Sequence, residues 1–383
     1  MKKKLNYLEG IRGWAALVVF IHHFLLGFVP QRHGLIEGFI PEGNLKETPF
    51  FLLLNGSAAV TVFFVLSGFV LSLFLWENND YVFRSVIKRW PRLILLPLIS
   101  VIFVYCLNEY HLLYFKRAAV ITHSSWMSDF AYSTNKGMIT EGFADAFLQG
   151  SLFTFFRGDA SLNSSLWTMN IEFIGSIIVF AFVAICSTQT LKNTIILAII
   201  ISMIFFFNNS YYYSAFLLGA ILSKAHIGNK LEKIKNGMAL RLALFTSIIF
   251  LGYVEPGTGF YTFMSHYGMD YVRIYLHSFS AAVVVLYCLK SESMRRYLSS
   301  NASIFLGRIS FPLYVIHVPI LFSLSSLLFI NLIQALSYPI SVALLFIVSL
   351  IACFAVAYVL SIVDKKWCEL INYVFKPVNF SRK

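Results

Sequence analysis

The chain has 383 residues, of which 58% are hydrophobic and only 13% are charged, and its mean hydropathy is +0.74. A soluble domain carries about 25% charged residues, so this composition excludes a water-soluble protein and predicts one embedded in lipid. The net charge of +12 is spread over short segments between apolar runs, which indicates membrane topology signals and argues against a nucleic-acid-binding surface.

Ten segments in chain order are candidates for membrane-spanning helices, each of which needs about 20 mostly apolar residues. Their approximate ranges are 10–29, 50–76, 93–109, 166–186, 194–208, 210–223, 240–254, 271–289, 307–330 and 337–362. The fifth, sixth and seventh are short. We therefore predict an all-α integral membrane protein with about ten transmembrane helices, in which residues 1–383 form one membrane domain.

The basic residues predict the orientation of these helices. With a cytoplasmic N-terminus, the cytoplasmic segments hold 23 of the 30 Lys and Arg residues. This positive-inside distribution predicts that both termini are cytoplasmic. The longest loop, about 110–165, is then extracytoplasmic. Either it packs over the membrane domain or gates an acceptor site, or it simply connects two helices.

Two ionisable residues of the first predicted helix, Arg12 and His23, lie eleven residues apart. Eleven steps make three helical turns plus about 20°, so both side chains share one face and are about 16 Å apart along the axis. Arg can bind a phosphate at the membrane surface, and neutral His can act as a general base toward a hydroxyl. The alternative is that His23 bonds a neighbouring helix and Arg12 extends to the interface.

Later segments add polar residues at depths where ionisable groups are costly unless they are paired or face a cavity. Ser67 and Gly68 allow close approach of a ligand or of another helix. Arg89 and Arg92 are candidate phosphate ligands, although ordinary positive-inside charge explains them equally well. Glu172 is predicted at the level of His23, where it would orient the imidazole; the alternative is a structural ion pair or a solvated carboxylate.

Aromatic and imidazole groups complete the candidate site. Tyr314 and His317 are three residues apart and share a helix face, so either they line a substrate path together with Trp167 or they serve packing. The five cysteines show no metal-ligand spacing, and we predict neither a disulfide nor a metal site. They are Cys106, Cys186, Cys288, Cys353 and Cys368.

These segments resemble the acyltransferase-3 family of integral membrane acyltransferases, which includes O-antigen and peptidoglycan O-acetylases. The most specific match is the first helix, where Leu8-Glu9-Gly10 opens the motif and Arg12 and His23 have the family's Arg-x(10)-His spacing. The other matched positions are Phe63 to Phe69, Arg89, Arg92, Leu166, Trp167, Glu172, Ser310, Tyr314, His317 and Pro319. Departures are Thr61 in place of a common acidic residue and Phe311 in place of the usual Tyr.

The resemblance implies that acetyl-CoA, or another acyl-CoA bound from the cytoplasm, donates a short acyl group to a hydroxyl of a cell-envelope or exported glycan. It also implies that His23 is the catalytic imidazole, that Arg12 is essential, and that the protein lies in a bacterial inner membrane. The expected partners are lipid and a glycan acceptor, without nucleic acid, and no additional esterase-like domain is expected. The alternatives are a polysaccharide transporter or flippase and a non-catalytic glycan-assembly protein.

Overall fold

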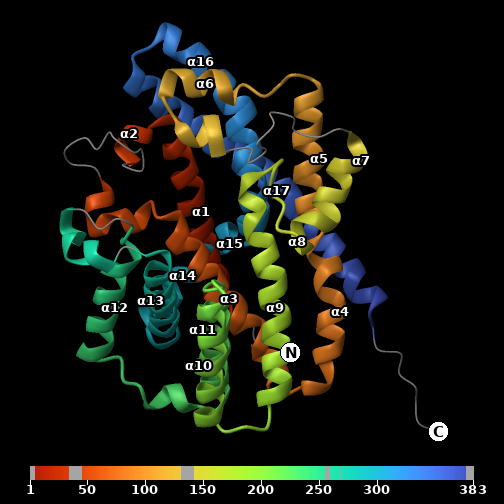
Figure 1. The fold of residues 1–383 in the computed structure, drawn as a ribbon, viewed down its shortest axis with the longest axis vertical. Coiled ribbons are helices and arrows are strands. Elements are labelled where there is room, and N and C mark those ends of the chain that lie inside the picture. Colours follow the sequence, from red (N-terminus) through yellow and green to blue (C-terminus); the bar gives the residue numbers. More distant parts are fainter. Residues whose placement is uncertain (1–4, 34–44, 131–141, 255–258, 268, 377–383) are drawn as a thin grey trace.

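The computed structural model describes residues 5–33, 45–130, 142–254, 259–267 and 269–376. All regular elements in these residues are helices (Figure 1). The long apolar helices are α1 (Asn6–Phe28), α3 (Gly56–Leu75), α5 (Leu95–Glu109), α9 (Trp167–Cys186), α10 (Leu191–Phe207), α11 (Tyr213–Ile227), α12 (Met238–Leu251), α13 (Asp270–Lys290), α15 (Asn301–Ile320) and α17 (Tyr338–Val374). Shorter helices are α2 (Pro30–His33), α4 (Val82–Leu93), α6 (Phe115–Thr122), α7 (Phe143–Leu148), α8 (Thr154–Phe156), α14 (Glu292–Leu298) and α16 (Ser326–Ala335).

Each of the ten predicted segments coincides with one of the long apolar helices, which makes the chain an all-α, multi-pass membrane protein. In the described residues, seven helical stretches are long and apolar enough to cross a bilayer, counting α4 with α5 and α15 with α16 as continuous. The helices α10, α11 and α12 have 17, 15 and 14 residues, fewer than the roughly 20 of a full span. By length and composition, seven rather than ten helices therefore qualify as spans.

Glycines bring α1 and α15 into close contact. A Cβ atom on Gly13 would overlap the backbone nitrogen of Gly307, and one on Gly307 would overlap the carbonyl oxygen of Glu9. The indole of Trp14 adds a hydrogen bond from Nε1 to Ser303 Oγ at 3.1 Å. Small residues allow this approach of membrane helices, and the contact turns one face of α1 toward α15.

The contact between α3 and α11 has the same basis. A Cβ on Gly68 would overlap the carbonyl oxygen of Phe216, and one on Gly219 would overlap that of Val65. Gly68 is thus buried between helices rather than at a ligand site, which corrects its assignment as a ligand-binding residue in favour of the packing alternative. The adjacent Ser67 instead contacts α9, through Glu172.

The segment predicted as a long external loop folds over the end of α1. Figure 1 shows α6 beside α16 at the upper end of the molecule, and these two helices are in contact. After α6, Ser124 Oγ donates a hydrogen bond to the carbonyl of Leu26 at 2.6 Å, and Met127 packs against Gly27. Of the alternatives for this segment, the structure supports packing over the membrane domain; its residues 131–141 lie outside the described part.

Candidate active site

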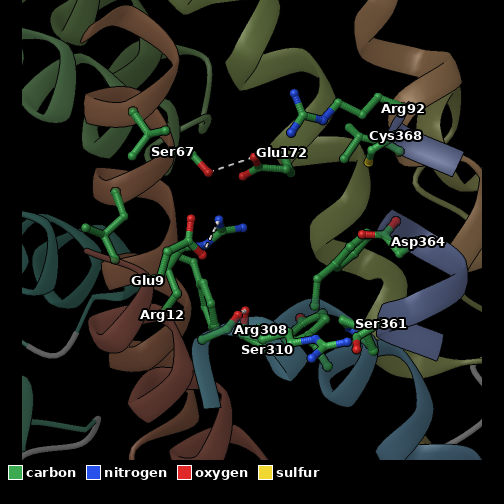
Figure 2. A pocket seen from close by; sticks show the side chains of 18 of the residues that line it. Glu9, Arg12, Ser67, Arg92, Glu172, Arg308, Ser310, Ser361, Asp364 and Cys368 are labelled. Atoms are coloured by element: carbon green, nitrogen blue, oxygen red, sulfur yellow. Dashed lines mark hydrogen bonds and ion pairs between the residues drawn. The ribbon is translucent and has the colours of Figure 1, made fainter. Parts of the chain in front are cut away.

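A cavity of about 710 Å³ lies between α1, α3, α4, α9, α15 and α17, within the range of about 300–1,000 Å³ that is usual for small-molecule sites. Its ionisable and hydroxyl side chains surround one hollow (Figure 2). They are Glu9, Arg12, Ser67, Arg89, Arg92, Thr168, Glu172, Arg308, Ser310, Tyr314, Ser361, Asp364 and Lys365, with the thiol of Cys368. Five basic residues against three acidic ones give the lining a positive charge that favours an anionic ligand.

An ion pair stands in the wall of this cavity. Glu172 Oε1 accepts hydrogen bonds from Arg89 Nη2 at 2.5 Å and from Ser67 Oγ at 2.7 Å. Arg89 Nε also donates to Ser176 Oγ at 2.8 Å. The two charged side chains are only 9% and 17% exposed, so each depends on the other for compensation of its charge. The pair joins α4 to α9, with α3 attached through Ser67.

The structure replaces the predicted pair between Glu172 and His23 with this one. A buried guanidinium requires a carboxylate, and Arg89 is the partner that Glu172 has. The predicted role of Arg89 as a phosphate ligand also changes, because its guanidinium is already bonded within the protein. Arg92 stays exposed at the cavity, near the thiol of Cys368.

His23 is bonded instead to His317. His23 Nδ1 lies 2.8 Å from His317 Nε2, and His317 Nδ1 lies 3.0 Å from the carbonyl of Leu313. A carbonyl only accepts hydrogen bonds, so His317 Nδ1 carries a proton and Nε2 of the neutral ring is an acceptor. His23 must then donate from Nδ1, which leaves the lone pair of its Nε2 available to take a proton.

Aromatic rings surround this histidine pair. Trp126 stacks on His23 with ring centroids 5.0 Å apart and an angle of 27° between the planes. His22 meets His23 edge to face at 5.2 Å, and its Nδ1 lies 2.7 Å from the carbonyl of Leu54. Trp126 belongs to the long loop, and nothing in the order of residues indicates that its ring reaches a histidine of the first helix.

Among the described residues, the cavity lining includes Phe63, Thr168 and Tyr314 but not His23. The rings of Phe63 and Tyr314 lie 6.0 Å apart, and Tyr314 OH donates to the carbonyl of Ser165 at 2.9 Å. Tyr314 precedes His317 by about one helical turn, or roughly 5 Å along α15. The rings of Tyr314 and His317 lie 6.1 Å apart, so Tyr314 links the cavity lining to the histidine pair.

A proline and an asparagine fix α15 at this level. Pro319 has no N–H to donate to the carbonyl of Val315, and Asn163 Nδ2 donates to that oxygen instead, at 2.7 Å. The carbonyl freed by the proline is thus satisfied by a side chain from the start of the α9 region. This bond holds the turn that carries His317.

Of the two aromatic residues predicted to line a substrate path, only one lines the cavity. Tyr314 lines the cavity, whereas Trp167 lies outside its lining and packs on the ring of Tyr212 at 5.7 Å. Sequence reasoning missed the contribution of α17, which extends beyond the predicted end at residue 362 to Val374. Ser361, Asp364 and Cys368 follow one another at spacings of three and four residues, and this helical spacing is the signal that could have revealed them.

Fold and site together define a multi-pass helical membrane protein with a positively charged internal cavity that ends close to a hydrogen-bonded histidine pair. The chain belongs to the acyltransferase-3 family: the profile of this family, described as an acyltransferase domain, matches residues 5–359. The predicted resemblance is thereby confirmed over nearly the whole chain, and it supports acyl transfer at a membrane. Neither the curated proteins nor the solved structures that were compared with the chain include a match.

Proposed function

We propose that this protein transfers an acetyl or other short acyl group from cytoplasmic acyl-CoA to a hydroxyl of a cell-envelope or exported glycan, in the inner membrane of a bacterium. The observation that carries the proposal is the position of Arg12 and His23 along α1. Arg12 lines the cavity beside Gly307 and Ser310 of α15, and His23 bonds His317 of the same helix. One helix face thus leads from a phosphate-binding guanidinium to a proton acceptor.

The donor binds with its phosphates at the basic end of the cavity. Arg92 is exposed there, and Arg12 is 35% exposed with Glu9 3.6 Å away. Such a partly solvated ion pair is weak, so the Arg12 guanidinium is available for a diphosphate, with which Arg forms paired hydrogen bonds. The acyl-bearing arm extends between α1, α3 and α15, and the thioester reaches His23 when the rings of Phe63 and Tyr314 turn aside.

The chemistry then requires one proton acceptor. His23 Nε2 takes the proton of the acceptor hydroxyl while the oxygen of that hydroxyl attacks the carbonyl carbon of the thioester. The carbon–sulfur bond breaks, and the leaving sulfur takes the proton back from Nε2, which gives an ester and free CoA thiol. His317 stabilises the transient His23 cation by accepting its Nδ1 proton in a hydrogen bond. An acyl group carried briefly on His23 would use the same nitrogen.

Label transfer tests the proposal. Purified protein receives radiolabelled acetyl-CoA together with envelope glycans, and mass spectrometry locates added acetyl groups. We expect labelled glycan from the natural protein and none from His23→Ala. The matched control is His226→Ala, since His226 is also half-buried and contacts a ring, that of Phe69, but lies outside the cavity lining.

Two outcomes would contradict the proposal. Full activity of His23→Ala would remove His23 from the mechanism. Failure of the natural protein to transfer label from acetyl-CoA and from longer acyl-CoA donors would favour a transporter or an assembly protein, because neither requires acyl transfer.

A further inference from the structure

A second hollow, of about 280 Å³, adjoins the main cavity along α4. Both hollows share Leu71, Arg89 and Arg92 in their linings. The rest of the smaller lining consists of Phe74, Tyr81, Arg84, Ser85, Lys88, Ile371 and Asn372. The two hollows thus adjoin at Arg92, past which one elongated molecule can extend from one hollow into the other.

The cations of this second hollow form a stripe on α4. Arg84, Lys88 and Arg92 follow one another at intervals of four residues, so they lie on one helix face, where like charges destabilise the helix. Arg84 and Arg92 both repel the ammonium of Lys88. A charge arrangement of this kind is stabilised by an anion placed among the three groups.

Protein carboxylates do not supply that anion. In the described part of the chain, no acidic side chain lies within ion-pair distance of Arg84 or Lys88. The polar partner of Lys88 is neutral: its Nζ donates to Asn372 Oδ1 at 3.0 Å. Arg89, the neighbouring cation, is by contrast satisfied by Glu172. The stripe is thus open to a ligand, while Arg89 is not.

The other walls are mostly apolar. Trp367 Nε1 donates to the carbonyl of Pro91 at 2.8 Å, which fastens the last turns of α17 to α4 and places Ile371 in the wall. Phe74 and Tyr81 meet edge to face at 5.5 Å. Two aromatic rings beside a row of cations form a surface suited to a flat base that carries phosphate.

We infer that this second hollow binds the 3′-phosphorylated adenosine of the acyl-CoA donor, with Arg84 and Lys88 on the 3′-phosphate and the Phe74–Tyr81 side on the base. The inference rests on the proposed function. The inference is based on the order of the parts of the donor. Nucleotide, diphosphate and acyl-bearing arm follow one another along acyl-CoA, and the small hollow, the shared Arg92 and the main cavity follow one another in the same order in the protein. Arg84 and Lys88 belong to none of the motifs discussed above.

Acetyl-CoA and acetyl-3′-dephospho-CoA, which lacks only the phosphate in question, test the assignment. Both donors are compared on protein reconstituted in zwitterionic vesicles, so that anionic lipid is absent. We expect the natural protein to prefer acetyl-CoA about tenfold or more in kcat/KM, as the loss of charge-assisted hydrogen bonds predicts. The double variant Arg84→Gln, Lys88→Gln should lose this preference through a higher KM for acetyl-CoA, with kcat and the KM for the dephospho donor unchanged.

The control removes two exposed cations elsewhere, with Lys233→Gln and Lys235→Gln, and should keep the preference. Transfer from both donors with the same preference in the Arg84, Lys88 double variant would overturn this assignment and leave the proposed function intact. An equal loss with both donors would also overturn it, because the two cations would then serve helix stability or lipid. Absence of transfer from either donor in the natural protein would overturn both.

Discussion

The hydrogen bond from His23 to His317 decides, at the scale of single residues, which nitrogen of His23 can take a proton. His317→Phe keeps a planar ring in the buried site but removes the acceptor, so the His23 ring is free to adopt the wrong tautomer. We expect kcat to fall by about 10² or more, in line with the loss of other base-orienting groups. The KM for acetyl-CoA should change little, because His317 does not line the cavity.

His317→Gln is the matched variant, because the amide oxygen of Gln can accept the Nδ1 proton of His23. It should recover part of the kcat that His317→Phe loses, at similar thermal stability. The measurement is steady-state kinetics together with the pH dependence of kcat, which reports the acid–base group in the donor complex. A His317→Phe protein with natural kcat and an unshifted pH profile would show that His317 only fills space.

The sequence correctly predicted which residues share a face of one helix, but not which residues of different helices contact one another. Arg12 and His23 belong to one helix, so its period alone placed them on a common face, and both do contact α15 or the cavity beside it. The partner of Glu172 depends on how α3, α4 and α9 pack against one another, and the periodicity of a single helix does not predict this packing. Trp126 likewise reaches His23 only because the loop folds back over α1.

The contact of α1 with α15 is the feature at the scale of elements on which the histidine pair depends. Gly13→Ala places a Cβ against the backbone of Gly307, so the helices must separate. We expect a loss of about 1–3 kcal/mol in stability, which is usual for an overpacked site, and a fall in kcat as His23 and His317 move apart. Thermal unfolding in detergent and label transfer measure the two effects.

Gly237→Ala is the control for this substitution, because a Cβ there meets no atom within 4 Å. It should leave both stability and transfer unchanged. Unaltered activity in Gly13→Ala would mean that the histidine pair does not require this helix contact. The sequence indicates Gly10 only as part of a family motif, whereas the packing role of this part of α1 becomes visible with Gly307 opposite Gly13.

Hydropathy located the ten long helices but not where the last of them ends. The apolar run of α17 stops near residue 362, yet the helix continues to Val374 because its polar residues face the cavity and Trp367 bonds α4. Hydropathy measures the preference of a segment for lipid, so it does not reveal that a helix continues beyond the membrane as a polar segment. The cavity is partly built from this extension, which is why sequence reasoning found only part of its lining.

The short helices α10 to α12 raise the question, at the scale of the whole molecule, of how many times the chain crosses the membrane. Trp76, at the end of α3, bonds Ser223 near the end of α11 at 2.8 Å. Asn55, at the start of α3, bonds the carbonyl of Leu251 at the end of α12 at 2.7 Å. α12 follows α11, so it starts on the side of the membrane domain where α3 ends, and it finishes on the opposite side, where α3 begins.

The same reasoning extends to α10 and favours ten crossings. α10 begins beside the end of α9, where Thr194 contacts Cys186, and its Ser202 carbonyl accepts a bond from Tyr275 of α13 at 3.3 Å. Arg273, two residues before Tyr275 and near the start of α13, donates to Ser57 at the start of α3. Although α10, α11 and α12 are short, each of them runs between the two sides that α3 connects.

Accessibility of single cysteines in intact cells checks this topology. With Cys106 and Cys368 replaced by Ser, we introduce Asn208→Cys between α10 and α11, or Lys233→Cys between α11 and α12; both positions are exposed. Positive-inside charge places Lys233 in the cytoplasm, so a membrane-impermeant maleimide should label position 208 before lysis and position 233 only after it. Equal labelling of both positions from one side would mean that α11 does not cross, and the chain would then have fewer than ten spans.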